Sequence, residues 1–227
     1  LVWGAAMFAV AKRDDARDIY GKVCTYFFCV ATFFALGVSV LIKDALKIIA
    51  TPQFLAAHRV VPIVMVGLLF LAAANFFETG IHLARRTVFR ALAVGSAAGL
   101  TLLLNWLLVP RFGMMGAAWA TLLSFAALAA VSYILGQRLY RITYEVSRLA
   151  KLTGVAAFLY WASTWVHVAS TAGSIGVRCA LVLLYPALLY VLGFYRHEEL
   201  AKVARLGHVV ATSAYGWLRY APMRSSE

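Results

Sequence analysis

Long apolar runs separated by short polar clusters make up most of the sequence. An α-helix rises about 1.5 Å per residue, so about 20 apolar residues are needed to cross a hydrocarbon core of about 30 Å. Four runs come close to this length, at residues 23–42, 60–77, 91–109 and 112–137. A fifth stretch, 152–195, is too long for one crossing, and its small residues at 169–173 predict a turn between two further spans.

This pattern predicts an all-α fold, a polytopic transmembrane helix bundle of about six spans. Residues 12–151 hold the first four spans, and residues 152–195 hold the last two. Residues 1–11 are apolar but too short to cross, and no basic region precedes them, so we expect the end of a truncated transmembrane helix and not a signal peptide. Residues 196–227 combine basic residues with apolar ones near helical spacing, which predicts a basic amphipathic tail at the membrane surface.

Composition agrees with the pattern and excludes a soluble globule. Hydrophobic residues make up 63% of the 227 and charged residues only 13%, which leaves too little polar surface to face water. The three cysteines, Cys24, Cys29 and Cys179, lie inside apolar runs without metal-ligand spacing, so we interpret them as apolar packing residues. No metal site or cofactor is expected.

The positive charges are distributed unevenly between alternate loops. Of the 21 Lys and Arg residues, 16 fall in the segments around residues 12–22, 85–90 and 138–151 and in the tail, and 5 fall on the other side. Because cytoplasmic loops retain positive charge, this split predicts that the first group of loops and the C-terminus are cytoplasmic. Cations dispersed over membrane loops do not form a nucleic-acid-binding face, so no nucleic-acid partner is expected.

The segment from residue 102 to 125, "LLLNWLLVPRFGMMGAAWATLLSF", has helix-breaking and turn-forming residues at distinctive positions. It predicts an apolar helix that carries Asn105, stops at Pro110, turns on Gly113 and restarts through small residues that allow close packing. This layout resembles the C-terminal half of the polysaccharide biosynthesis flippases, the lipid-linked oligosaccharide exporters of the multidrug/oligosaccharidyl-lipid/polysaccharide exporter superfamily. Residues 44–70 and 136–152 are similar to the same family, and the resemblance extends over roughly residues 1–152.

The resemblance implies a fold and a function. Flippases of this family have fourteen helices in two lobes around a central cavity, so the chain would hold the C-terminal part and lack the N-terminal lobe. The whole transporter would move polyprenyl-diphosphate-linked oligosaccharide across the cytoplasmic (inner) membrane by alternating access, without enzymatic chemistry. Its expected partners are membrane lipids, the lipid-linked oligosaccharide and the missing N-terminal lobe.

A polar stripe, "NFFETGIHLARR", ends the second apolar run. Asn75, Glu78 and His82 are three and four residues apart, a spacing that places them on one helix face, with Arg85 and Arg86 following. Facing the inter-lobe cavity, they would contact sugar or relay a proton. The alternative is a membrane boundary, at which Glu78 reaches the cytoplasmic interface or pairs with His82 or Arg86.

Other polar residues within the spans have simpler interpretations. Asn105 is a further candidate for contact with a sugar hydroxyl, although packing against a neighbouring helix explains it as well. His167 and Arg178 flank the predicted turn at residues 169–173, and we expect both to face solvent.

Two other classes of function remain open. The segment "RDDARD" places Asp14, Asp15 and Asp18 at a spacing that holds magnesium against a prenyl diphosphate in membrane-embedded transferases. Interleaved Arg13 and Arg17 explain the same pattern as pairing of charges on a helix surface. A split half that acts only as an assembly partner of another membrane protein is the third possibility.

Overall fold

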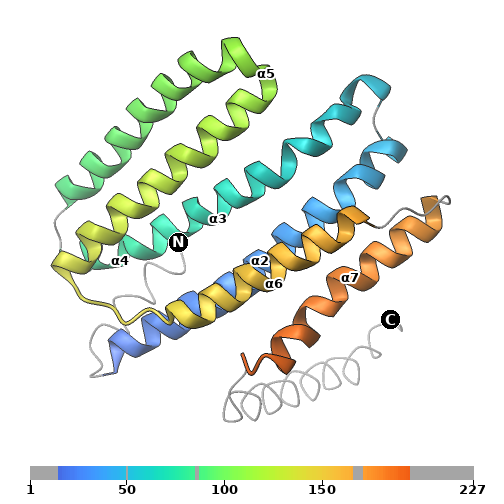
Figure 1. Ribbon diagram of the computed structural model, residues 1–227. Helices are drawn as coiled ribbons and strands as arrows, with labels where there is room; N and C mark the ends of the chain where they lie inside the picture. The colour runs from blue at the N-terminus through green and yellow to red at the C-terminus, as the bar shows by residue number, and fades with distance from the viewer. Residues whose placement is uncertain (1–14, 50, 85–86, 166–170, 195–227) are drawn as a thin grey trace, which may run out of the picture. The chain divides into compact units, whose positions relative to one another are not determined.

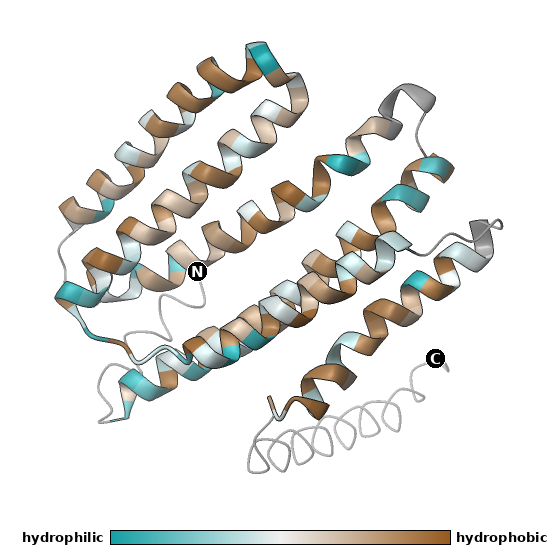
Figure 2. Cartoon of the chain, in the orientation of Figure 1, coloured by the Kyte–Doolittle hydropathy of each residue, from teal (hydrophilic) through white to brown (hydrophobic). Residues whose placement is uncertain are grey.

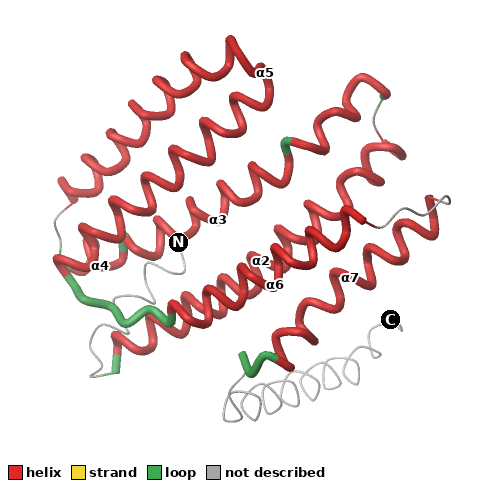
Figure 3. The backbone as a smooth tube through the Cα atoms, in the orientation of Figure 1, coloured by secondary structure: helices red, strands yellow, loops and turns green. Residues whose placement is uncertain are grey.

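The structure, a computed structural model, describes residues 15–49, 51–84, 87–165 and 171–194, and these are helical with no strand among them (Figures 1 and 3). The prediction of an all-α chain is confirmed. The predictions for residues 1–11 and 196–227 lie outside the described residues. The elements, in chain order, are α2 (Ala16–Ile49), the 3-10 helix η1 (Pro52–Arg59), α3 (Val61–Phe77), α4 (Thr79–Leu83), α5 (Thr87–Leu139), α6 (Val146–Trp165) and α7 (Thr171–Val191).

Within the described residues, four helical stretches are long and apolar enough to cross a membrane. They are Ala16–Ile49, Val61–Leu83, Val88–Leu139 and Gly173–Val191. Figure 2 shows that hydrophilic residues lie mainly toward the ends of the helices and apolar residues between them. Large apolar side chains such as Phe34, Leu102 and Trp106 are exposed along these stretches, as expected where lipid is the solvent.

Helix α5 is two helical arms joined at a sharp reversal (Figure 1). Gly113 has φ 55° and ψ −130°, a conformation that residues with a Cβ rarely adopt, and the chain turns back on itself there. The predicted helix end at Pro110 is three residues early, because the helical backbone continues through Pro110 to the reversal at Gly113. Gly116 then lies against the carbonyl of Leu108, with no room for a Cβ, so the arms meet closely beside the turn.

Small residues also bring α3 against both arms of α5. Their buried cluster contains two alanines of α3, two alanines of the first arm, and Leu128 and Ala129 of the second arm: Ala73, Ala74, Ala93, Ala97, Leu128 and Ala129. Since apolar burial gives little drive for helix association within lipid, close packing of small side chains supplies much of the attraction.

The chain divides into two compact units, Leu1–Tyr185 and Pro186–Glu227. The described part of the second unit is the end of α7 and its cap. There Gly193 has φ 64°, the Gly193 amide donates to the Tyr190 carbonyl, and the Phe194 amide donates to the Leu189 carbonyl. This is the Schellman arrangement, which explains why the helix ends at this glycine.

Candidate functional site

Glu78 lies at the joint between α3 and α4. Its backbone is helical, with φ −66° and ψ −14°, and its carbonyl accepts hydrogen bonds from the amides of Ile81 and His82, so the short α4 continues almost directly from α3. The residue is only 3% exposed. Its Oε2 accepts a hydrogen bond from Nε of Arg90, 2.9 Å away, in the first turns of α5.

Two glycines, Gly80 and Gly136, allow the backbones to approach closely beside Glu78. A Cβ on Gly80 would collide with the backbone of Gly136, and a Cβ on Gly136 would collide with the carbonyl of Phe77. The joint of α3 and α4, which carries Glu78, therefore crosses the second arm of α5 at backbone contact. A buried carboxylate needs a partner to offset the loss of its hydration, and Arg90 provides it.

The ion pair is asymmetric in exposure. The side chain of Glu78 is 4% exposed, whereas that of Arg90 is 48% exposed. A guanidinium carries five N–H donors, so the bond from Nε to Glu78 leaves the terminal nitrogens of Arg90 to other acceptors. The carboxylate thus orients a half-exposed cation.

The other residues of the stripe differ from Glu78 in their surroundings. Asn75 is exposed, and its Nδ2 donates to the carbonyl of Leu71, 3.1 Å away in the same helix. His82 is half-buried in the last turn of α4. Glu78 is buried and bound by Arg90, a partner that the boundary interpretation did not name. Arg85 and Arg86 lie outside the described residues.

Asn105, the fourth candidate, lies in the first arm of α5. Its Nδ2 donates to the carbonyl of Thr101, 2.8 Å away, and the hydroxyl of Thr101 donates in turn to the carbonyl of Ala97. These bonds stay within one helix. The side chain is half-buried, and its amide oxygen is the group that remains for an external donor.

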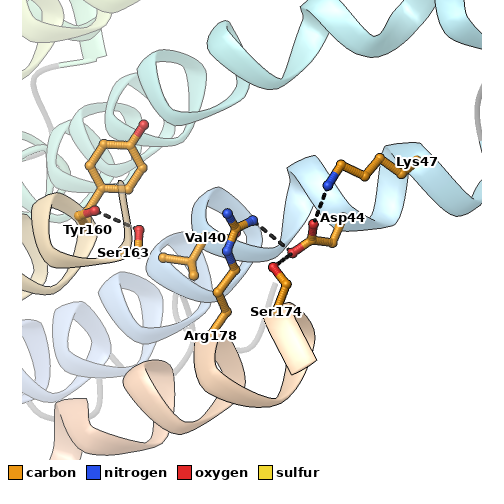
Figure 4. A network of polar contacts seen from close by, with 7 residues as sticks. All are labelled: Val40, Asp44, Lys47, Tyr160, Ser163, Ser174 and Arg178. Carbon is orange, nitrogen blue, oxygen red and sulfur yellow. Dashed lines mark hydrogen bonds and ion pairs between the residues drawn. The ribbon is translucent and has the colours of Figure 1, made fainter. Parts of the chain in front are cut away.

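A second buried charge cluster, which sequence reasoning missed, links α2 to α7 (Figure 4). Asp44 is 1% exposed, and its Oδ2 accepts hydrogen bonds from Nη1 of Arg178 at 2.8 Å and from Oγ of Ser174 at 3.0 Å. Its Oδ1 accepts from Nζ of Lys47 at 3.2 Å. Figure 4 shows Arg178 and Ser174 reaching from α7 toward the carboxylate on α2.

The expectation that Arg178 faces solvent is wrong, because the residue is only 8% exposed and its charge is balanced by Asp44. His167, which had the same expectation, lies outside the described residues. The available signal was that Arg178 is the single charged residue in the apolar stretch 152–195, where an unpaired charge is costly.

The aspartates near the N-terminus have a structural contact. Oδ1 of Asp18 accepts a hydrogen bond from Oγ1 of Thr143 at 2.9 Å, which ties α2 to the loop between α5 and α6. Asp15 is exposed, and Asp14 lies outside the described residues. In the part of the chain that the structure describes, no three His, Cys, Asp or Glu side chains come together as a metal site.

The same loop, residues 140–145, packs against the helix ends. The ring of Tyr144 contacts Phe77 and Tyr133, with centroid distances of 5.1 and 6.1 Å. Burial, with smaller contributions from Cys24 and Tyr133, raises the pKa of the Tyr144 hydroxyl well above its ordinary value. Cys24 is buried, whereas Cys29 and Cys179 are half-buried.

Comparison with known proteins gives a limited similarity. Over 89 residues the chain is 41% identical to a protein of Bacillus subtilis (strain 168) described as "Uncharacterized membrane protein YabM". The similar segment spans 39% of this chain and only 15% of that relative's length. No model of a known family matches the chain, and no solved structure is significantly similar to it. Together with the four apolar helical stretches, this similarity identifies the chain as a multi-pass membrane protein.

Proposed function

We propose that the chain is the C-terminal part of a transporter that flips polyprenyl-diphosphate-linked oligosaccharide across the cytoplasmic membrane. The order of motifs described above supports this proposal, and so does the helical hairpin of α5, which turns within the Pro-Arg-Phe-Gly segment that carries the resemblance. A glycan with a charged diphosphate cannot cross about 30 Å of hydrocarbon unsolvated, so such a transporter must present polar and cationic groups within its membrane helices.

In this proposal the chain crosses the membrane six times. The apolar stretch Val88–Leu139 has 52 residues, a length of about 78 Å if it were straight, which is more than twice the thickness of the hydrocarbon core. The reversal at Gly113 divides it into two arms of about one crossing each. α6, with 20 residues, also has the length of one crossing, and α2, α3 with α4, and α7 supply the other three.

The observation that carries the proposal is the buried pair of Glu78 and Arg90. Ionisable side chains inside membrane helices are costly and mark substrate or ion pathways. Here Glu78 holds Arg90 by Nε, and the half-exposed guanidinium keeps N–H groups for another acceptor. Phosphate and sugar oxygens are suitable acceptors, because an arginine binds phosphate through two parallel hydrogen bonds. In this role Arg90 contacts the substrate, and Glu78 positions it.

Substitutions at Arg90 and Glu78 in the full-length transporter test the proposal. Arg90→Gln is expected to accumulate normally but to lower glycan export by about tenfold or more, because the substrate loses a charge-assisted hydrogen bond. Arg90→Lys keeps the charge without the planar fork, so its export should be intermediate. Export of labelled glycan at matched expression, over roughly pH 6 to 8, measures both, and Glu78→Gln is expected to lower export because Arg90 loses the carboxylate that orients it.

Arg111→Gln is the matched control, since it removes an exposed arginine at the reversal of α5. If Arg90→Gln exports as well as Arg111→Gln at equal expression, Arg90 does not contact substrate and the proposal loses its main support. If Glu78→Gln exports normally at every pH, Glu78 does not belong to the site. Residues 1–227 expressed alone should not restore export, because alternating access requires two lobes around a shared cavity.

A further inference from the structure

A cavity of about 710 Å³ lies where the second arm of α5 ends and the loop to α6 begins. Its lining residues are Tyr133, Ile134, Gln137, Arg138, Leu139 and Arg141. The volume is in the range of cavities that accept small-molecule ligands. Two guanidinium groups and an amide in so small a set of residues indicate an anionic ligand.

The charge of this cavity is not balanced within the part of the chain that the structure describes. Arg138 and Arg141 are both exposed, and neither has a carboxylate partner there. The acidic groups of neighbouring segments are engaged elsewhere: Oε2 of Glu145 binds Arg148 at 3.1 Å, and Oδ1 of Asp18 binds Thr143. Among the described residues, the two arginines therefore form a cationic site without a counterion.

The backbone that carries the two arginines is held in place. Nε2 of Gln137 donates to the carbonyl of Ile142 at 2.8 Å, and the Ile142 amide donates back to Oε1 of Gln137 at 3.0 Å. This reciprocal pair fixes the loop residue Arg141 relative to Arg138 on the helix. Fixing the geometry before binding reduces the entropy that a ligand must otherwise offset.

The surroundings specify the kind of anion. Tyr133 and Ile134 lie about one turn before Arg138 on an apolar helix, and both are exposed. A ligand that contacts these two residues and both arginines has a charged head at the helix end and an apolar body along the helix. Arginine pairs match phosphate oxygens, and basic pockets at the ends of membrane helices bind the headgroups of anionic lipids. We propose that this cavity binds the phosphate headgroup of an anionic phospholipid.

Lipid titration of the purified chain tests this site independently of transport. Phosphatidylglycerol is added to residues 1–227 in mild detergent, and bound lipid is counted by native mass spectrometry. Removing one arginine near a lipid headgroup should weaken binding about fivefold, so Arg138→Gln with Arg141→Gln should weaken it about 30-fold. Gln137→Leu keeps both charges but frees the loop, and its loss should be smaller than that of the double variant.

The matched control is Arg59→Gln with Arg111→Gln, which removes two exposed arginines outside the cavity and should leave binding unchanged. Phosphatidylcholine, which has no net charge, should bind wild type more weakly than phosphatidylglycerol. The proposal is overturned if both double variants bind phosphatidylglycerol alike, or if the two lipids bind wild type equally. Full displacement of the lipid by inorganic phosphate would also overturn it, because it would show a phosphate site that does not require the lipid chains.

Discussion

At the scale of single residues, two buried carboxylates of the described chain pair with arginines of another helix. Glu78 joins the α3–α4 joint to α5, and Asp44 joins α2 to α7. Sequence reasoning found Glu78 because it stands in a polar stripe, but it missed the pairing of Asp44 with Arg178. Hydropathy judges each position by its near neighbours, whereas these partners are separated by 134 residues along the chain. Only the fold brings their charges together.

Asp44→Asn tests how much the second pair stabilises the fold. The change leaves Arg178 buried without a counter-charge, and breaking a buried pair in this way costs about 3–5 kcal/mol. Adding Arg178→Met should recover part of the loss, because the uncompensated charge is then removed as well. Reversible unfolding in detergent, as a double-mutant cycle, measures the coupling.

Lys47→Gln is the control for this cycle. Its side chain is 45% exposed, so loss of its bond to Asp44 should cost no more than about 1 kcal/mol. If Asp44→Asn is no more destabilising than Lys47→Gln, the cluster does not hold α7 against α2.

At the scale of helices, the apolar runs predicted where most helices lie but not where they begin and end. The run at residues 23–42 is the middle of α2, which spans Ala16–Ile49. The helix is longer because polar residues continue the backbone hydrogen bonds beyond the apolar core. The reversal within α5 was predictable, since Gly113 follows a proline in an apolar run. The short η1 and α4 were not, because neither has a periodic pattern long enough to detect.

The crossing of α4 and α5 gives a prediction at this scale. In Gly136→Ala the new Cβ meets the carbonyl of Phe77, so the helices must separate, at a cost of about 1–3 kcal/mol. Gly99→Ala, on the first arm of the same helix, places its Cβ in open space and should stabilise the helix by up to about 1 kcal/mol. The two variants should therefore change the free energy of unfolding in opposite directions. Equal effects would show that the close crossing is not needed for stability.

At the scale of the whole molecule, the distribution of cations predicts the orientation. Basic residues gather at the end of the bundle that holds the start of α2 and the loop between α5 and α6, whereas the reversal at Gly113 carries only Arg111. Hydropathy predicted the class of protein, an all-α multi-pass membrane protein, and the structure has four helical stretches that are candidate spans among its described residues. Hydropathy could not predict which helices contact one another, because the lipid-facing and buried faces are both apolar.

Reporter fusions check this orientation. A reporter placed after Glu227 should be active in the cytoplasm, and a cysteine at Thr171, in a background where Cys24, Cys29 and Cys179 are replaced, should react with a membrane-impermeant reagent from outside. Both outcomes follow from retention of the more basic loops in the cytoplasm. Reporter activity outside the cytoplasm at the C-terminus would reverse the topology and, with it, the leaflet that each ion pair faces.

The sharp reversal at Gly113 also bears on how the chain enters the membrane during synthesis. A single charged residue, Arg111, lies within the Pro110–Gly113 turn, so moving the turn through the bilayer transfers only one cation. Gly116 lies against the carbonyl of Leu108, so lipid has little access to the backbone between the arms beside the turn. We therefore expect the two arms of α5 to enter the membrane together as one helical hairpin, in which each arm shields the other as the turn crosses.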